Sequence, residues 1–141
     1  MTNTTNILHK ELSYSIVGCI YEVRNTFGSG QKEIVYQNAL SESLEQHHLP
    51  YRREVSITIR SPETGKSLGT YVLDFVVDEK VIIEVKAIKF TPRKIEQQLY
   101  GYLKSTLYEV GYLVNFGSPS LYLKRVILTN ERKHISHSFN S

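Results

Sequence analysis

Several residue types that would point to a specialised class of protein are scarce in this chain of 141 residues. Tryptophan is absent and cysteine occurs once, as Cys19, so the chain can form no internal disulfide framework and offers no thiolate cluster for zinc. The unbroken aliphatic runs are no longer than that of Val81–Ile83, far shorter than the roughly 20 apolar residues that a membrane span requires. Residues 1–6 lack the basic start and apolar core of a secretory signal. We therefore expect a soluble, cytoplasmic protein.

Charge and histidine content are also modest. The net charge of +3 permits a polyanionic partner but is far milder than the clustered charge of an obligate nucleic-acid coat. The histidines lie in the N-terminal segment, at a helix end or in the polar tail, as with His134 and His137, so we expect no zinc site. Hydrophobic residues make up 40% of the chain, enough for one α/β core. We expect a single domain over residues 1–129 and a polar C-terminal tail over residues 130–141.

Two helices are expected before the first strand. Between residues 7 and 27, apolar side chains recur at steps of three and four, which is the spacing of an amphipathic helix. The sequence Gly28-Ser29-Gly30 ends this helix, and a second one is expected from about Gln31 to His48, before Pro50.

From Arg52 the hydrophobic period changes to two, which predicts a half-buried strand up to Arg60. Further strands are expected over residues 68–77, 81–87, 108–115 and 121–128, with a helix between the third and fourth strands. This helix is predicted to open with the Thr91 hydroxyl as its cap and Pro92 in its first turn, and to continue to Leu107. The order α-α-β-β-β-α-β-β predicts an α/β fold in which helices flank a mixed central sheet, in two or three layers.

An acid and a base share one face of the third expected strand. Glu84 and Lys86 are two residues apart, so their side chains project from the same face. In the preceding strand, Asp74 interrupts an apolar stretch, where a carboxylate is costly unless something compensates it. If Val77 pairs with Val81 across a three-residue turn, Asp74 directly opposes Glu84. A two-residue turn would instead place the two acids on opposite faces.

Two carboxylates roughly 5 Å apart on adjacent strands should repel each other, and the pKa of one should rise unless a cation lies between them. A hard divalent ion with oxygen ligands is the natural cation. In a purely structural alternative, Lys86 pairs with one acid and the other acid faces solvent.

Other polar residues have ordinary interpretations when each is taken alone. Glu33 begins the second helix and can interact with the helix dipole, with Tyr36 one turn further on. Gln98 and Tyr102 are four residues apart on one face of the later helix.

Taken together, these segments resemble the GxxExxY family of the PD-(D/E)xK nuclease superfamily. The naming motif matches Gly30 to Tyr36 in full, and the resemblance extends over residues 12–128. Asp74 falls where the superfamily has its acid of the second strand, and residues 84–86 fall on (D/E)xK. Residues 98–102 match the QxxxY motif of RecB-like members. The resemblance implies a restriction-endonuclease-like core.

The resemblance also implies roles for individual residues. Glu33, Asp74, Glu84 and the carbonyl of Val85 would surround Mg²⁺ (or Mn²⁺), and Lys86 would orient the attacking water or stabilise the developing charge. Gln98 would complete the catalytic set and brace the site. Substrate contacts are expected from Tyr36, Gln98, Tyr102, Lys89, Arg93 and Lys94.

The sequence therefore predicts a metal-dependent nuclease that hydrolyses phosphodiester bonds, with DNA as the expected substrate. A different class stays open, in which the chain is a non-catalytic nucleic-acid-binding or assembly module that retains the nuclease fold. The purely structural role for the acids also stays open. A homodimer that presents two sites to a duplex is compatible with the sequence.

Overall fold

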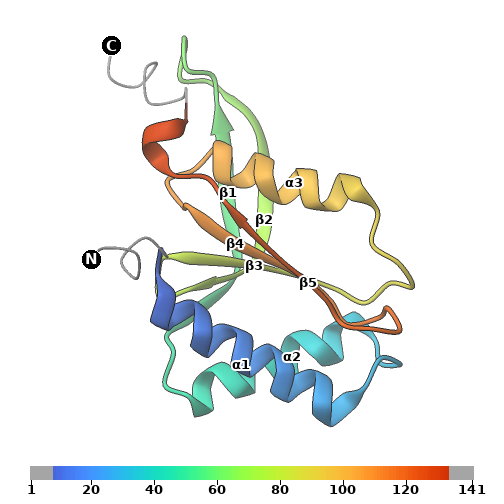
Figure 1. Cartoon of the computed structure of the whole chain (residues 1–141). Helices are drawn as coiled ribbons and strands as arrows, with labels where there is room; N and C mark the ends of the chain where they lie inside the picture. The colour runs from blue at the N-terminus through green and yellow to red at the C-terminus, as the bar shows by residue number, and fades with distance from the viewer. Residues whose placement is uncertain (1–7, 134–141) are drawn as a thin grey trace.

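The computed structural model describes residues 8–133 and has three layers. A five-stranded sheet carries α1 and α2 on one face and α3 on the other (Figure 1). The elements are α1 (Lys10–Phe27), α2 (Glu33–Gln46), β1 (Tyr51–Arg60), β2 (Ser67–Val77), β3 (Val81–Lys86), α3 (Arg93–Lys104), β4 (Val110–Asn115), β5 (Tyr122–Ile127) and a 3-10 helix, η2 (Asn130–Arg132).

The strands follow one another in the sheet in chain order, β1-β2-β3-β4-β5. Neighbouring strands are antiparallel except β3 and β4, which are parallel. A parallel pair needs a crossover connection, and α3 supplies it. The predicted mixed sheet and the predicted order of elements are confirmed.

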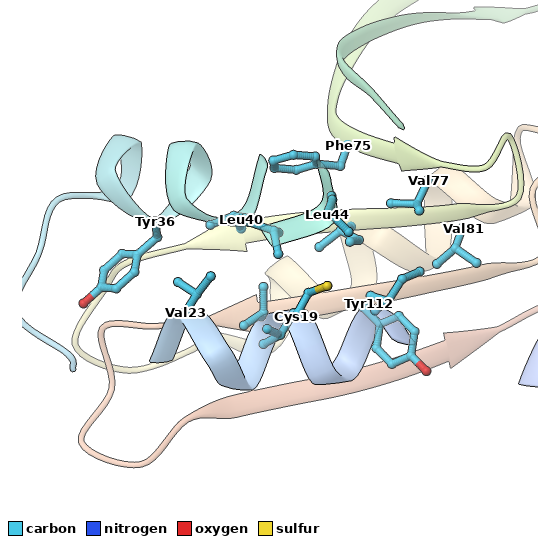
Figure 2. Packing of buried hydrophobic residues seen from close by; sticks show 14 of the residues in the cluster. Cys19, Val23, Tyr36, Leu40, Leu44, Phe75, Val77, Val81 and Tyr112 are labelled. Carbon is cyan, nitrogen blue, oxygen red and sulfur yellow. The ribbon is translucent and has the colours of Figure 1, made fainter. Parts of the chain in front are cut away.

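Two hydrophobic cores hold the layers together. The first lies between the sheet and the helices α1 and α2, where Cys19 and Leu40 pack with Phe75 and Tyr112 (Figure 2). The second lies under α3, where Leu103 packs against the opposite face of the sheet. Burying a large aliphatic or aromatic side chain contributes about 1.5–3 kcal/mol. Cys19 is fully buried, so it is a small apolar core residue.

The β1–β2 ribbon changes the face that it buries at Glu54. Tyr51 packs against the first core and Val55 against the second, although alternate positions of a regular strand share a face. Glu54, between them, has a φ of 53°, a left-handed conformation that is uncommon for a residue other than glycine. The pairing of β1 with β2 skips Glu54 and Asp74. The backbone pairing is therefore interrupted beside Asp74.

The predicted start and end of the last helix are wrong. α3 begins at Arg93 with Pro92 at its N-cap and no side-chain cap, because the Thr91 hydroxyl instead accepts a hydrogen bond from Asn115 Nδ2 at 2.8 Å. The helix ends at Lys104 rather than at Leu107, which is exposed. The Thr106 hydroxyl donates to the Tyr102 carbonyl at 2.8 Å and so satisfies one of the carbonyls at the helix end.

Part of the segment expected as a polar tail packs on the domain. The Lys133 side chain is 2% exposed, and its Nζ donates to the carbonyls of Thr106 at 2.8 Å and Tyr108 at 2.7 Å. Residues 134–141, with His134 and His137, lie outside the described residues. Among the described helices, none is both long and apolar enough to cross a membrane.

Candidate active site

The β2–β3 hairpin has the register that the sequence predicts. Val77 pairs with Val81, and the pairing continues until Phe75 opposite Ile83. The turn between the strands is Asp78–Lys80, which is the three-residue turn that the sequence predicts. The ladder ends at Phe75 and Ile83, and the next residues on the two strands are Asp74 and Glu84.

Beyond the ladder, the side chains of the two acids accept hydrogen bonds from backbone amides of the opposite strand. The amide of Asp74 donates to Glu84 Oε2 at 3.0 Å, and the amide of Val85 donates to Asp74 Oδ2 at 2.8 Å. Each carboxylate is therefore held by the strand opposite to its own. Hydrogen bonds from backbone amides to a charged acceptor are stronger than those between neutral groups. The hairpin thus fixes both side chains where its strands separate.

Burial and mutual repulsion control the electrostatics of this pair. The Glu84 side chain is 6% exposed. Burial, and then the negative charge of Asp74, raise the pKa of Glu84 to about 8. Burial also raises the pKa of Asp74, although the Val85 amide and the positive charge of Lys86 oppose this rise. The repulsion that the sequence predicts between the two acids is therefore present in the structure.

Lys86 lies on the face expected for it but does not neutralise the acids by contact. Its charge lowers the pKa of Asp74 and Glu84, so it lies within electrostatic reach of both. Within residues 8–133, however, the ion pairs closer than 4.0 Å join other residues, none of them Lys86, Asp74 or Glu84. The purely structural alternative, in which Lys86 pairs directly with one acid, is therefore not what the structure shows.

Glu33 is the first residue of α2 and lies at the edge of this site. Partial burial raises its pKa, the charge of Lys86 lowers it and the charge of Asp74 raises it. Its Oε2 accepts a hydrogen bond from Gln37 Nε2 at 3.3 Å. In the part of the chain that the structure describes, no three His, Cys, Asp or Glu side chains come together as a group able to hold a metal ion. Glu33 is thus near Asp74 and Glu84 but does not complete a three-acid cluster with them.

Tyr36, expected to bind substrate, is instead part of the scaffold. Its side chain is fully buried and stacks on Phe116, with ring centroids 4.5 Å apart and ring planes 7° apart. Its hydroxyl donates to the Gly28 carbonyl at 2.7 Å and accepts from the Gln31 amide at 3.1 Å. The predicted substrate contact is therefore wrong, because the ring is enclosed. Tyr36 holds the glycine-containing loop that leads to Glu33 (Figure 2 shows its place in the first core).

Gln98 and Tyr102 lie on α3 as expected. Tyr102 is 7% exposed and its ring meets that of Tyr71 at a centroid distance of 5.4 Å. Burial, and then the charge of Glu84, raise the pKa of Tyr102 to about 12. Gln98 is exposed and lines a cavity together with Tyr102.

The expected phosphate-binding residues are exposed and lie within a short stretch of the chain. Lys89 belongs to the connection that follows β3, and Arg93 and Lys94 begin α3. Their contact with phosphate stays a prediction.

Asn115 is an organising residue of the site that the sequence analysis missed. It is fully buried at the end of β4. Its Oδ1 accepts hydrogen bonds from the amides of Ile88 at 3.0 Å and Gly117 at 2.9 Å, and its Nδ2 donates to the Thr91 hydroxyl. One side chain therefore ties the connection after Lys86 to the end of the neighbouring strand. A polar residue that closes the apolar run 110–114 was the signal for it.

The same connection is packed against Gly117 too closely for a side chain there. A Cβ atom at Gly117 would lie 2.5 Å from the Ile88 nitrogen. The Phe116 amide also donates to the Lys86 carbonyl at 2.8 Å. The backbone on the C-terminal side of Lys86 is thereby fixed by β4 and the loop that follows it.

Replacement of Asn115 by alanine should therefore destabilise the protein. The variant leaves the part-buried amides of Ile88 and Gly117 without their acceptor, and an unsatisfied buried group costs about 1–3 kcal/mol. Urea denaturation would measure the free energy of unfolding. Asn38→Ala is the matched control, because Asn38 is exposed and accepts a hydrogen bond from Arg53 at 2.8 Å. Equal stabilities of the two variants would refute the assigned role of Asn115.

Comparisons with known proteins agree with this geometry. The family model described as "PD-(D/E)XK nuclease superfamily" matches residues 10–126. The crystal structure of SSO0001 is similar in fold, with a TM-score of 0.55 and 18% sequence identity. That similarity covers 75% of this chain and 55% of SSO0001, so this chain spans little more than half the length of that protein. No curated protein sequence gives a significant match.

The matched region includes the whole β2–β3 hairpin with its two acids and Lys86. It also includes the crossover helix α3 and the parallel pair of β3 and β4. The sequence match, the mixed sheet and the position of the acid pair lead to one assignment. The chain belongs to the PD-(D/E)XK nuclease superfamily.

Proposed function

We propose that this protein is a divalent-metal-dependent nuclease of the GxxExxY type that hydrolyses phosphodiester bonds in DNA. The observation that carries the proposal is the pair Asp74 and Glu84. The two carboxylates lie on adjacent strands, largely buried, and are held by each other's backbone where the ladder ends. Neither has a cation within ion-pair distance among the described residues.

The donor set suits a hard divalent cation such as Mg²⁺ or Mn²⁺. Mg²⁺ is usually bound by one or two carboxylates, with water and substrate phosphate as its other ligands. Asp74 and Glu84 would hold the ion together with the carbonyl of Val85, and Glu33 is a further candidate from the edge of the site. A bound ion supplies Lewis acidity and a water that ionises near neutral pH.

The other residues of the site have roles that follow from their positions. The ammonium group of Lys86 shares the face of Glu84, where it would orient the attacking water or stabilise charge that develops on the phosphate. Gln98 and Tyr102, from the helix across the sheet face, would contact the substrate strand. Lys89, Arg93 and Lys94 would contact phosphates and so contribute affinity without sequence preference.

Incubation with DNA tests the proposal. Purified protein would be mixed with supercoiled plasmid, linear duplex and single-stranded DNA, in Mg²⁺, in Mn²⁺ or in EDTA. We expect cleavage with the metal ions and none with EDTA. An Asp74→Asn variant purified in the same way controls for contaminating nucleases. DNA binding without metal-dependent cleavage would favour the non-catalytic module instead, and wild-type cleavage no greater than that of the variant would refute the nuclease proposal.

A further inference from the structure

A cavity of about 250 Å³ opens between α3 and the part of the β1–β2 ribbon that extends beyond β3. Figure 1 shows α3 lying across this ribbon. The cavity is lined by Ile59, Tyr71, Gln98, Gly101, Tyr102 and Ser105.

The cavity lies beside the acid pair. Tyr71 lies three residues before Asp74 in β2. Tyr102 packs in the same core as Leu73, which adjoins Asp74, and Ile82, which is two residues before Glu84. The charge of Glu84 also contributes to the raised pKa of Tyr102. A group held in the cavity would therefore lie next to whatever the acid pair acts on.

The lining combines aromatic rings with a few polar groups. Tyr102 is nearly buried and supports the ring of Tyr71 in a tilted contact of 54°. Tyr71 is itself 46% exposed, so much of its ring is open to a ligand. Gln98 provides an amide donor and acceptor, which matches the edges of nucleobases. Aromatic surface with amide groups is typical of sites in which a base stacks and forms hydrogen bonds.

We propose that this cavity receives one unpaired nucleobase adjacent to the phosphate that is cleaved, so that the substrate includes a single-stranded region. The inference rests on the proposed nuclease function and narrows its substrate. A paired base is stacked on both sides, so it can reach such a cavity only after it leaves the duplex. Strand ends, flaps and single strands provide unpaired bases at lower cost.

The positions of residues on α3 suit a nucleic-acid strand that runs along this helix. Lys94, Gln98 and Gly101, together with Ser105 at the C-cap, are spaced at three and four residues and so lie along one side of α3. Three of these residues line the cavity and Lys94 lies one turn before them. Lys94 is exposed and is therefore placed to contact the phosphate of a strand whose base enters the cavity.

Two opposite changes test the cavity. Tyr71→Ala removes the exposed ring. Gly101→Leu fills the space instead; a Cβ at Gly101 meets no heavy atom within 4 Å, and leucine has a higher helix propensity than glycine. Tyr21→Ala is the matched control, because Tyr21 is 47% exposed and lies on α1, away from the cavity. Thermal denaturation would establish that all three variants fold.

Binding is measured in EDTA, so that it does not depend on cleavage. The probe is a short single-stranded oligonucleotide that carries a fluorescent base analogue, and the comparison is the same sequence in a blunt duplex. We expect the single strand to bind more tightly and its fluorescence to be quenched. Tyr71→Ala and Gly101→Leu should each weaken single-strand binding by about 10-fold or more, whereas Tyr21→Ala should not.

The outcomes separate this inference from the proposed function. Unchanged single-strand affinity in both cavity variants, or preference of the wild type for the blunt duplex, would overturn the inference even if the protein cleaves DNA. Cavity-dependent binding without metal-dependent cleavage would support the base site and remove the nuclease proposal.

Discussion

Lys86→Ala is expected to lower metal-dependent DNA cleavage by about 10²–10³-fold, which is the usual loss when one group that stabilises transition-state charge is removed. The lysine lies on the same strand face as Glu84 and within electrostatic reach of Asp74. It makes no ion pair closer than 4.0 Å among the described residues, so its loss should disturb the fold little. The measurement is the initial rate of plasmid cleavage at saturating Mg²⁺.

Lys80→Ala is the control for this variant. Lys80 belongs to the turn of the same hairpin and pairs with Asp78 at 3.2 Å, so its replacement removes the same charge away from the acid pair. We expect Lys80→Ala to cleave DNA at close to the wild-type rate. If Lys86→Ala and Lys80→Ala retain equal activity, Lys86 has no role in catalysis.

Glu84→Gln should make the metal-free protein more stable at alkaline pH, although it should abolish cleavage. The pKa of Glu84 is about 8 in the folded protein, against an ordinary value of 4.5. The folded state therefore binds this proton more tightly than the unfolded state does. The resulting stabilisation is fully present below pH 4.5 and is lost as the pH rises through about 8. Glutamine stays neutral and can still accept the hydrogen bond from the Asp74 amide, so the variant keeps this stability.

The pH profile of stability measures this effect. Urea denaturation in EDTA should give similar free energies of unfolding for both proteins near pH 5, and a gap on the order of 4 kcal/mol in favour of the variant near pH 9. Glu42→Gln, at an exposed position on α2, controls for the loss of one negative charge. Parallel profiles for wild type and Glu84→Gln would show that Glu84 is not a buried acid with a raised pKa.

Much of this architecture follows from local rules that a sequence displays. The hairpin register is set by the length of its turn, and a three-residue turn places Asp74 just beyond the last pair of the ladder, on the same side as Glu84. The helices α1 and α2 follow from apolar spacing and from the break at residues 28–30. The acid pair was therefore predictable, because its geometry depends on residues that are close in the chain.

What the sequence did not reveal depends on contacts between distant segments. Thr91 is a residue type that often caps helices, but its hydroxyl accepts a hydrogen bond from Asn115, which lies at the end of β4. Tyr36 is a residue type that often contacts nucleic acid, but the ring of Phe116 stacks on its ring. The left-handed conformation of Glu54 has no local signal, because glycine is the residue expected there. Tyr71 gains its significance only when the ribbon packs against α3.

Calorimetric titration with Mn²⁺ tests the central claim, that Asp74 and Glu84 form a divalent-metal site, most directly. The wild-type protein would be compared with the double variant Asp74→Asn/Glu84→Gln, in which both side chains can still accept the backbone hydrogen bonds. We predict saturable binding of Mn²⁺ to the wild type and no such binding to the double variant. Absence of binding to the wild type, or equal binding to both proteins, would contradict the account.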